Sequence, residues 1–225
     1  EGGDVHPMRP DLLLLGFSDR SSPAARDLLC DLVFQHCNVT DVVIVVLPAE
    51  RTAIHRDMIF TQVDRDLCVV YPPHFVGPER LAVLHRRKRS KGVKEVPNFF
   101  AAMQAVDHPF EPIFCGGNQR TTQGREQWAS ACNSVAVRPG VVLTYDRNDA
   151  TLGELTAAGF RQISAVNLLT GDETLADGER AVISIDGGEQ GSTTNGAPGS
   201  KRYRVTSKGP GGHSYGAFGL VSPAF

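Results

Sequence analysis

Short apolar runs separated by polar turns recur along most of the chain. Residues 11–17 (DLLLLGF) and 41–47 (DVVIVVL) are rich in Leu, Val and Ile and predict two buried strands. Between them, Ser21-Ser22-Pro23 predicts the start of a helix that runs to about Cys37. The apolar stripe of that helix is expected to consist of Leu28, Leu29, Leu32 and Val33.

The same alternation continues to about residue 185. Pro139-Gly140 predicts the turn of a hairpin, and Gly159 predicts the end of a helix. Pairs of strands that alternate with single helices indicate an α/β chain of repeated strand–strand–helix units. Expected strands cover residues 57–63, 67–71, 110–115, 134–138, 141–145, 160–166 and 180–185, and expected helices cover residues 78–88, 97–106, 121–132 and 150–158.

The composition changes after about residue 186. Residues 187–200 (GGEQGSTTNGAPGS) are small and polar, which indicates a loop or linker. A short strand is expected over 202–206, followed by the glycine-rich string GPGGHS. We therefore expect two parts, residues 1–183 and residues 184–225.

The overall composition restricts the partners and the compartment. The net charge is -2, so we expect no nucleic acid partner, and no apolar run approaches the roughly 20 residues that cross a bilayer. The five cysteines include no C-x-x-C pair, which disfavours a disulfide framework or a cysteine zinc site and favours the cytoplasm. We expect no cofactor and no bound metal. The chain begins without Met and reads like the middle of something longer.

Three groups of residues could carry chemistry. Glu1-Gly2-Gly3-Asp4 sets two carboxylates around two glycines, although a turn with solvated acids explains the pattern as well. His55 and Asp57 would share one face of an extended segment and could move protons or hold a metal, or they could form a surface pair. Arg20 follows a buried strand and could clamp a carboxylate, or it could merely flank the helix start.

Three other features are assigned to structure. The basic run over 86–94 is expected to be a solvated face at the end of the helix 78–88. Cys115 is expected to be a buried strand residue although two glycines follow it. Trp128 is expected to lie in the core.

Taken together, the motifs resemble the arginine deiminase family over about residues 1–183. They occur in the same order and spacing, as EGGDV, GFSDRSS, AIHRDMIFTQVDRD, FCGGN and REQWASACNSVAVRPGVVLTYDRN. The resemblance implies a hydrolase that converts L-arginine, or a related guanidine, and water to L-citrulline and ammonia. It also implies an α/β fold, an incomplete α/β-propeller of the pentein type.

The resemblance also implies roles for individual residues. His55 would be the acid/base, and Glu1 would orient it. Asp57 would bind the guanidinium, Arg20 would bind the α-carboxylate, and Asp4 would support the glycine-rich turn. The family's first guanidinium-binding Asp would precede Glu1. Its nucleophilic Cys would follow Cys132, where this chain has no cysteine. We therefore expect the chain to be inactive, and a non-catalytic fragment is the alternative.

The tail, residues 184–225, resembles the start of the dimerisation domain of zinc-dependent aminoacylase-type metallopeptidases. The strings ISIDG, TNGAPGSKRYRVT and GPGGHSYGAFG carry this resemblance. It implies that His213 would reach a substrate in an active site, often that of a partner subunit. A homo-oligomer, or a metallopeptidase-related interaction module, stays open on this ground. The other interpretation of the tail is a fused fragment.

Overall fold

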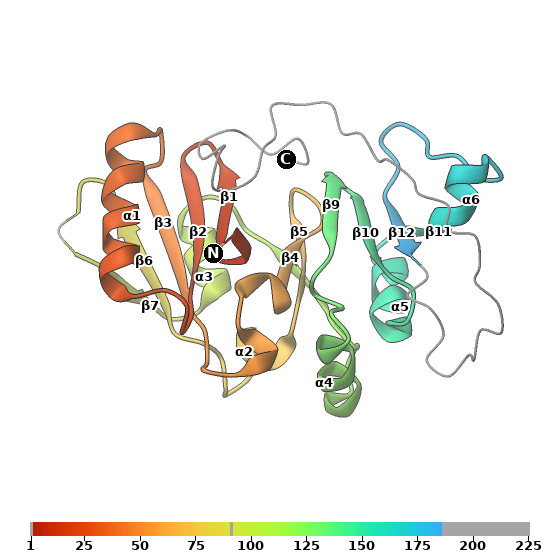
Figure 1. Cartoon of the computed structure of the whole chain (residues 1–225), viewed down its shortest axis with the longest axis horizontal. Coiled ribbons are helices and arrows are strands. Elements are labelled where there is room, and N and C mark those ends of the chain that lie inside the picture. Colours follow the sequence, from red (N-terminus) through yellow and green to blue (C-terminus); the bar gives the residue numbers. More distant parts are fainter. Residues whose placement is uncertain (1, 91, 186–225) are drawn as a thin grey trace.

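The structure, a computed structural model, describes residues 2–90 and 92–185. Within them three units follow one another, and each has an antiparallel strand pair followed by a strand parallel to the second member (Figure 1). The predicted α/β architecture of repeated units is therefore confirmed. None of the sheets within the described residues closes on itself. The propeller implied by the resemblance stays a prediction.

The first unit forms a five-stranded sheet in the order β1-β2-β3-β6-β7. Strands β2 and β3 are parallel because α1 connects them, and β6 and β7 extend the sheet in an antiparallel manner. Ser22 caps α1 as predicted, since its side chain accepts a hydrogen bond from the backbone N–H of Ala25. The elements are β1 (Val5–Arg9), β2 (Leu12–Phe17), α1 (Pro23–His36), β3 (Asp41–Val46), β6 (Val83–Arg87) and β7 (Lys94–Val96).

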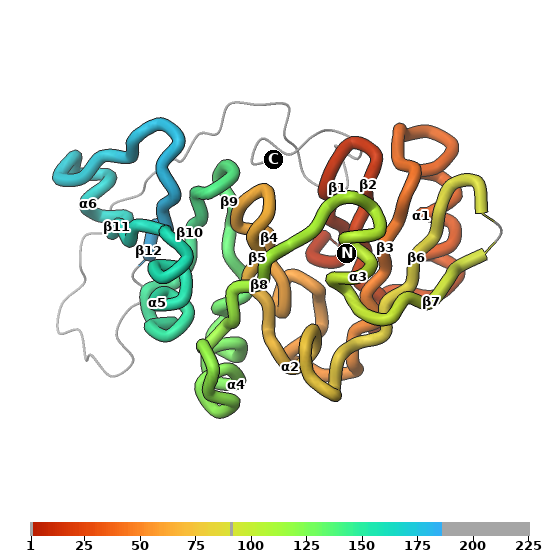
Figure 2. Tube along the Cα trace, turned by 180° about the vertical axis from the view of Figure 1, so that it is seen from behind, coloured from red at the N-terminus to blue at the C-terminus, as the bar shows by residue number. Residues whose placement is uncertain are grey.

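The second and third units have smaller sheets, ordered β4-β5-β8 and β11-β12-β10-β9. Figure 2 shows the second unit between the other two. The second contains β4 (Phe60–Gln62), β5 (Leu67–Val70), α2 (Pro72–Phe75), α3 (Phe99–Ala105) and β8 (Glu111–Phe114). The third contains α4 (Arg120–Trp128), β9 (Val135–Arg138), β10 (Val141–Tyr145), α5 (Asp149–Ala157), β11 (Arg161–Ser164), α6 (Ala165–Thr170) and β12 (Ala181–Ile185).

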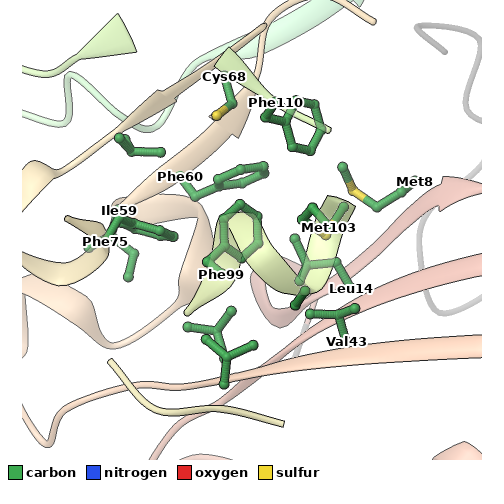
Figure 3. Packing of buried hydrophobic residues seen from close by; sticks show 14 of the residues in the cluster. Met8, Leu14, Val43, Ile59, Phe60, Cys68, Phe75, Phe99, Met103 and Phe110 are labelled. Atoms are coloured by element: carbon green, nitrogen blue, oxygen red, sulfur yellow. The ribbon is translucent and has the colours of Figure 1, made fainter. Parts of the chain in front are cut away.

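An aromatic cluster joins the first two units (Figure 3). Phe60 and Phe99 meet edge-to-face with ring centroids 5.1 Å apart, and Phe75 and Phe110 surround them. Leu14 and Val43 of the first sheet complete this core. Because Phe60 begins β4, the packing of its ring also fixes the end of the segment that carries His55 and Asp57.

The predicted helix over 78–88 is wrong. Residues 83–87 form β6, which pairs with β3, and the helix in this region is the short α2 at Pro72-Pro73. The backbone of β6 completes the hydrogen bonding of β3, a tertiary demand that outweighs local helix propensity. The basic run therefore lies in the β6–β7 hairpin, where Arg86 pairs with Asp31 and Arg87 with Asp41.

Two expectations about apolar side chains are also wrong. Leu28 and Leu32 are 61% and 44% exposed, because α1 packs on the sheet through Cys30, Val33 and Phe34 instead. Trp128 is 63% exposed at the end of α4, where the helix leaves the core. Cys115 is buried as expected. Helix α6, which buries no residue, was not predicted.

Glu126 fixes the third unit by capping α5. Its buried carboxylate accepts hydrogen bonds from the backbone N–H of Ala150 at 3.0 Å and from Thr151 N–H and Oγ1 at 2.9 and 2.7 Å. These N–H groups belong to the first turn of α5, which has no intrahelical acceptors for them.

Glu126→Gln is expected to lower the free energy of unfolding by about 2 kcal/mol, because the amide N–H₂ would face buried N–H donors. Urea denaturation followed by circular dichroism measures this change. Glu111→Gln, at an exposed carboxylate, is the control and should stay within about 0.5 kcal/mol of the original chain. Equal stability of the two variants would contradict the capping role.

Candidate active site

A single buried carboxylate organises the candidate site. Asp4 is 2% exposed and accepts hydrogen bonds from Ser18 Oγ and from the backbone N–H of Arg56, each at 3.0 Å. His55 Nδ1 lies 3.4 Å from Asp4 Oδ2. Asp4 thus joins the start of the chain, the end of β2 and the segment before β4. These contacts lie outside the glycine-rich turn whose support the resemblance assigned to Asp4.

Gly16 makes this arrangement possible. A Cβ atom at this position would lie 2.5 Å from Asp4 Oδ1 and 3.0 Å from Arg56 Cβ. Any side chain would therefore push the carboxylate or the segment away. The glycine in the string GFSDRSS is explained by this close approach.

His55 and Asp57 do not lie on one extended strand, contrary to the expectation from their spacing. His55 is extended, with φ -137° and ψ 152°, but Arg56–Met58 form a 3-10 turn. The turn separates the two side chains, so that His55 approaches Asp4 while Asp57 approaches Gly3. A Cβ on Gly3 would lie 2.6 Å from Asp57 Oδ2, so the absence of a side chain there leaves room for the carboxylate.

Asp57 lines a cavity of about 300 Å³ between the first turn and β9. The wall has both apolar and polar parts, and the residues beside Asp57 in it include Gly3, His6, Thr61, Gln62, Asn133 and Ser134. Burial raises the pKa of Asp57, while the neighbouring charges of Arg56 and His55 oppose that rise. A carboxylate held in this way is a suitable partner for a cation that enters the cavity.

Arg56 supplies a buried positive charge that interacts with the carboxylates of Asp4 and Asp57. Its side chain is 1% exposed, and burial lowers its pKa to about 10, so it remains protonated at neutral pH. One guanidinium N–H₂ group contacts His6 Nδ1, and Cζ lies 5.1 Å from the centre of the Phe60 ring. Among the described residues, Nε and Nη1 have no hydrogen-bond partner. The sequence did not single out Arg56 by itself.

Of the remaining candidate residues, only Arg20 lies in the described part of the chain. Arg20 is exposed in the turn after β2, and its backbone N–H donates to Ser18 Oγ at 3.3 Å. The same Ser18 hydroxyl binds Asp4, so Arg20 borders the site through one shared residue. Glu1 and His213 lie outside the described residues, as does most of the predicted tail, 186–225.

Comparison with known proteins identifies the family of this chain. The family model "Arginine deiminase" matches residues 1–172, which include all the described site residues. The chain belongs to the arginine deiminase family. It is 34% identical over 163 residues to an arginine deiminase of Rhodococcus erythropolis, and 30% identical over 169 residues to an arginine deiminase of Treponema denticola.

The similarity covers 71% and 72% of this chain but only 40% and 41% of those two relatives. The chain therefore spans about two fifths of the length of the curated arginine deiminases that it matches. A solved structure, the amidinotransferase SxtG from the saxitoxin biosynthetic pathway of Microseira wollei, is similar with a TM-score of 0.45 and 12% identity. That similarity covers 72% of this chain and 40% of SxtG.

None of the five cysteines is among the residues that line this cavity. Cys30, Cys68, Cys115 and Cys132 are buried, and Cys37 at the end of α1 is partly exposed. Burial raises the pKa of the Cys68 and Cys132 thiols well above the ordinary value, which suppresses the reactive thiolate.

In residues 2–90 and 92–185, no helix is long and apolar enough to cross a membrane. The same part of the chain contains no group of three or more His, Cys, Asp or Glu side chains arranged to hold a metal ion.

Proposed function

We propose that this site binds the guanidinium group of L-arginine, or of a related guanidine, as part of an arginine deiminase-type hydrolase. The observation that carries the proposal is the position of Asp57. Its partly buried carboxylate lines the cavity wall together with Gly3 and lies near His55. Membership of the arginine deiminase family supports it. The activity of the whole protein is part of the proposal, because the similarity covers only 40% of the length of the Rhodococcus erythropolis relative.

Asp57 is proposed to pair with the planar guanidinium. A carboxylate accepts two parallel N–H bonds from a guanidinium, which fixes the plane of the group as well as its position. The buried positive charge of Arg56 favours the ionised form of Asp57 before the ligand binds, and so opposes the effect of burial on its pKa. The positive charge of the bound guanidinium would stabilise the ionised form of Asp57 further.

His55 is proposed to transfer protons and Arg20 to hold the α-carboxylate. Asp4 beside His55 Nδ1 supports the first role, because a carboxylate at Nδ1 keeps a proton there and leaves Nε2 for exchange with a ligand. Arg20 is exposed at the edge of the site, where a charged ligand can reach it. Glu1 is proposed to orient His55, as the family resemblance implies.

The 225-residue chain is expected not to produce citrulline. The family mechanism needs a thiolate that attacks the guanidinium carbon and expels ammonia, and water then releases citrulline. None of the five cysteines lines the cavity, and four of them are buried. Loss of a nucleophile lowers kcat by about 10⁶ in a well-studied hydrolase, so turnover should be undetectable.

The measurement is citrulline formation by purified chain in millimolar L-arginine. Variants with each cysteine changed to Ala are the matched controls. Turnover that disappears in Cys37→Ala or Cys115→Ala would contradict the proposal, because it would identify a nucleophile that the described cavity does not contain. Background that is the same in all variants is the expected result.

The cytoplasm is the proposed compartment, because all five thiols are free, as expected under reducing conditions. The metallopeptidase-related function concerns residues 184–225, nearly all of which lie outside the described residues. No observation on the described residues favours it over the guanidine-binding function.

A further inference from the structure

A buried amide on α4 bridges the segment that carries His55 and Asp57. Gln127 is 2% exposed and its Nε2 donates to two backbone carbonyls, those of Thr52 and Met58. The bond to Met58 is 3.2 Å long. The two acceptors stand at opposite ends of the segment 52–58. One side chain therefore binds both ends of the segment that forms the proposed site.

The segment has little regular structure to hold it otherwise. It consists of two 3-10 turns, Arg51–Ala53 and Arg56–Met58, of three residues each. Asp4 holds the middle through the backbone N–H of Arg56, and Gln127 holds the ends. Without Gln127, the carbonyls of Thr52 and Met58 lose their bonds to α4, and the Arg56 bond and the packing of Phe60 after the segment are left to hold His55 and Asp57.

Glu126, the residue before Gln127, ties α4 to α5 and so limits the movement of the helix that carries Gln127. Glu126 binds the first turn of α5 through Ala150 and Thr151, so it faces away from the segment that Gln127 binds. Neighbouring residues of a helix point about 100° apart, which allows Glu126 and Gln127 to bind different elements. The string REQW thus connects the third unit to the site.

We infer that Gln127 is a positioning residue that sets the spacing of His55 and Asp57 for guanidinium binding, an inference that rests on the proposed function for its chemistry. Its amide is a donor of two protons matched to two carbonyl oxygens. Small displacements of binding groups reduce affinity and rate strongly, so a residue that touches no ligand can control both.

Gln127→Met tests the inference, because Met keeps the length of the side chain and removes both donors. Gln123 provides a matched control. It is a buried glutamine of the same helix whose Nε2 donates to the carbonyl of Gly117 at 2.7 Å, away from the segment 52–58. Both Gln127→Met and Gln123→Met should destabilise the fold in urea denaturation, because each leaves buried carbonyls without a donor.

Two readouts separate positioning from stability. Hydrogen exchange of the amides in 53–59 should accelerate about 10-fold in Gln127→Met and remain unchanged in Gln123→Met. The Kd for L-arginine should rise about 10-fold in Gln127→Met and change less than about 2-fold in Gln123→Met, as for other residues that support a ligand contact. If Gln127→Met does not fold, Gln127→Asn, which keeps the amide but shortens its reach, should give the same pattern with smaller changes.

Equal exchange and equal arginine affinity in Gln127→Met and the original chain would overturn the inference. The same changes in Gln123→Met would also overturn it, because they would reflect helix stability alone. If the original chain does not bind L-arginine, the proposed function fails by itself. The exchange of 53–59, together with the NMR shifts of the His55 imidazole, then still decides whether Gln127 positions the segment.

Discussion

Asp57→Asn is expected to weaken L-arginine binding by about 100-fold. The amide has the shape of the carboxylate but no charge, so the partly buried ion pair with the guanidinium is lost. Removal of one partner of such a pair costs about 2–5 kcal/mol, and the lower half of that range already corresponds to this factor. Equilibrium titration with L-arginine measures the change. Asp177→Asn, at an exposed carboxylate, alters the net charge equally and should leave the affinity unchanged.

The same residue should make arginine binding depend on pH. Burial raises the pKa of Asp57, so the carboxylate takes up a proton at a higher pH than an exposed aspartate does. The guanidinium binds the ionised form. Affinity should therefore be constant above this raised pKa and fall as the pH decreases through it. Asp57→Asn should show no such dependence, and an identical pH profile in both proteins would assign the titration to another group.

Asp4→Ala is expected to lower the free energy of unfolding by about 3 kcal/mol. The substitution leaves the Ser18 hydroxyl and the backbone N–H of Arg56 without their buried acceptor. It also removes a negative charge that stabilises the buried Arg56 guanidinium. Together these losses exceed that of one ordinary hydrogen bond.

Ser18→Ala is the comparison for this prediction. It removes one donor to Asp4 and leaves the acceptor with its other partners, so its cost should be about 1 kcal/mol. Urea denaturation of both variants measures the difference. Equal costs for Asp4→Ala and Ser18→Ala would mean that Asp4 does not organise the site.

Local sequence patterns predicted the elements whose burial is simple. The runs DLLLLGF and DVVIVVL became β2 and β3 because their continuous apolar character suits the centre of a covered sheet. The Ser22 cap and the Pro139-Gly140 hairpin depend only on neighbouring residues, and both are confirmed. The error at 78–88 arose because β6 is fixed by pairing with β3, about 40 residues earlier in the chain, which no local pattern reports.

The sequence predicted several residues of the candidate site but not their arrangement. Family motifs identified Asp4, His55 and Asp57 as candidates, but the 3-10 turn that separates His55 from Asp57 is not visible in their spacing. The roles of Glu126 and Gln127 were missed. Their partners lie 24 residues or more away, and those of Gln127 are backbone carbonyls that any residue types could supply. Only the folded arrangement brings them together.

Calorimetric titration of the 225-residue chain with L-arginine and with L-citrulline tests the central claim most directly. The two ligands have nearly the same shape, but only L-arginine carries a guanidinium cation for Asp57. The account predicts saturable binding of L-arginine, and binding of L-citrulline that is weaker by about 100-fold, the same factor as in Asp57→Asn. Equal affinity for the two ligands, or no saturable heat with L-arginine, would contradict it.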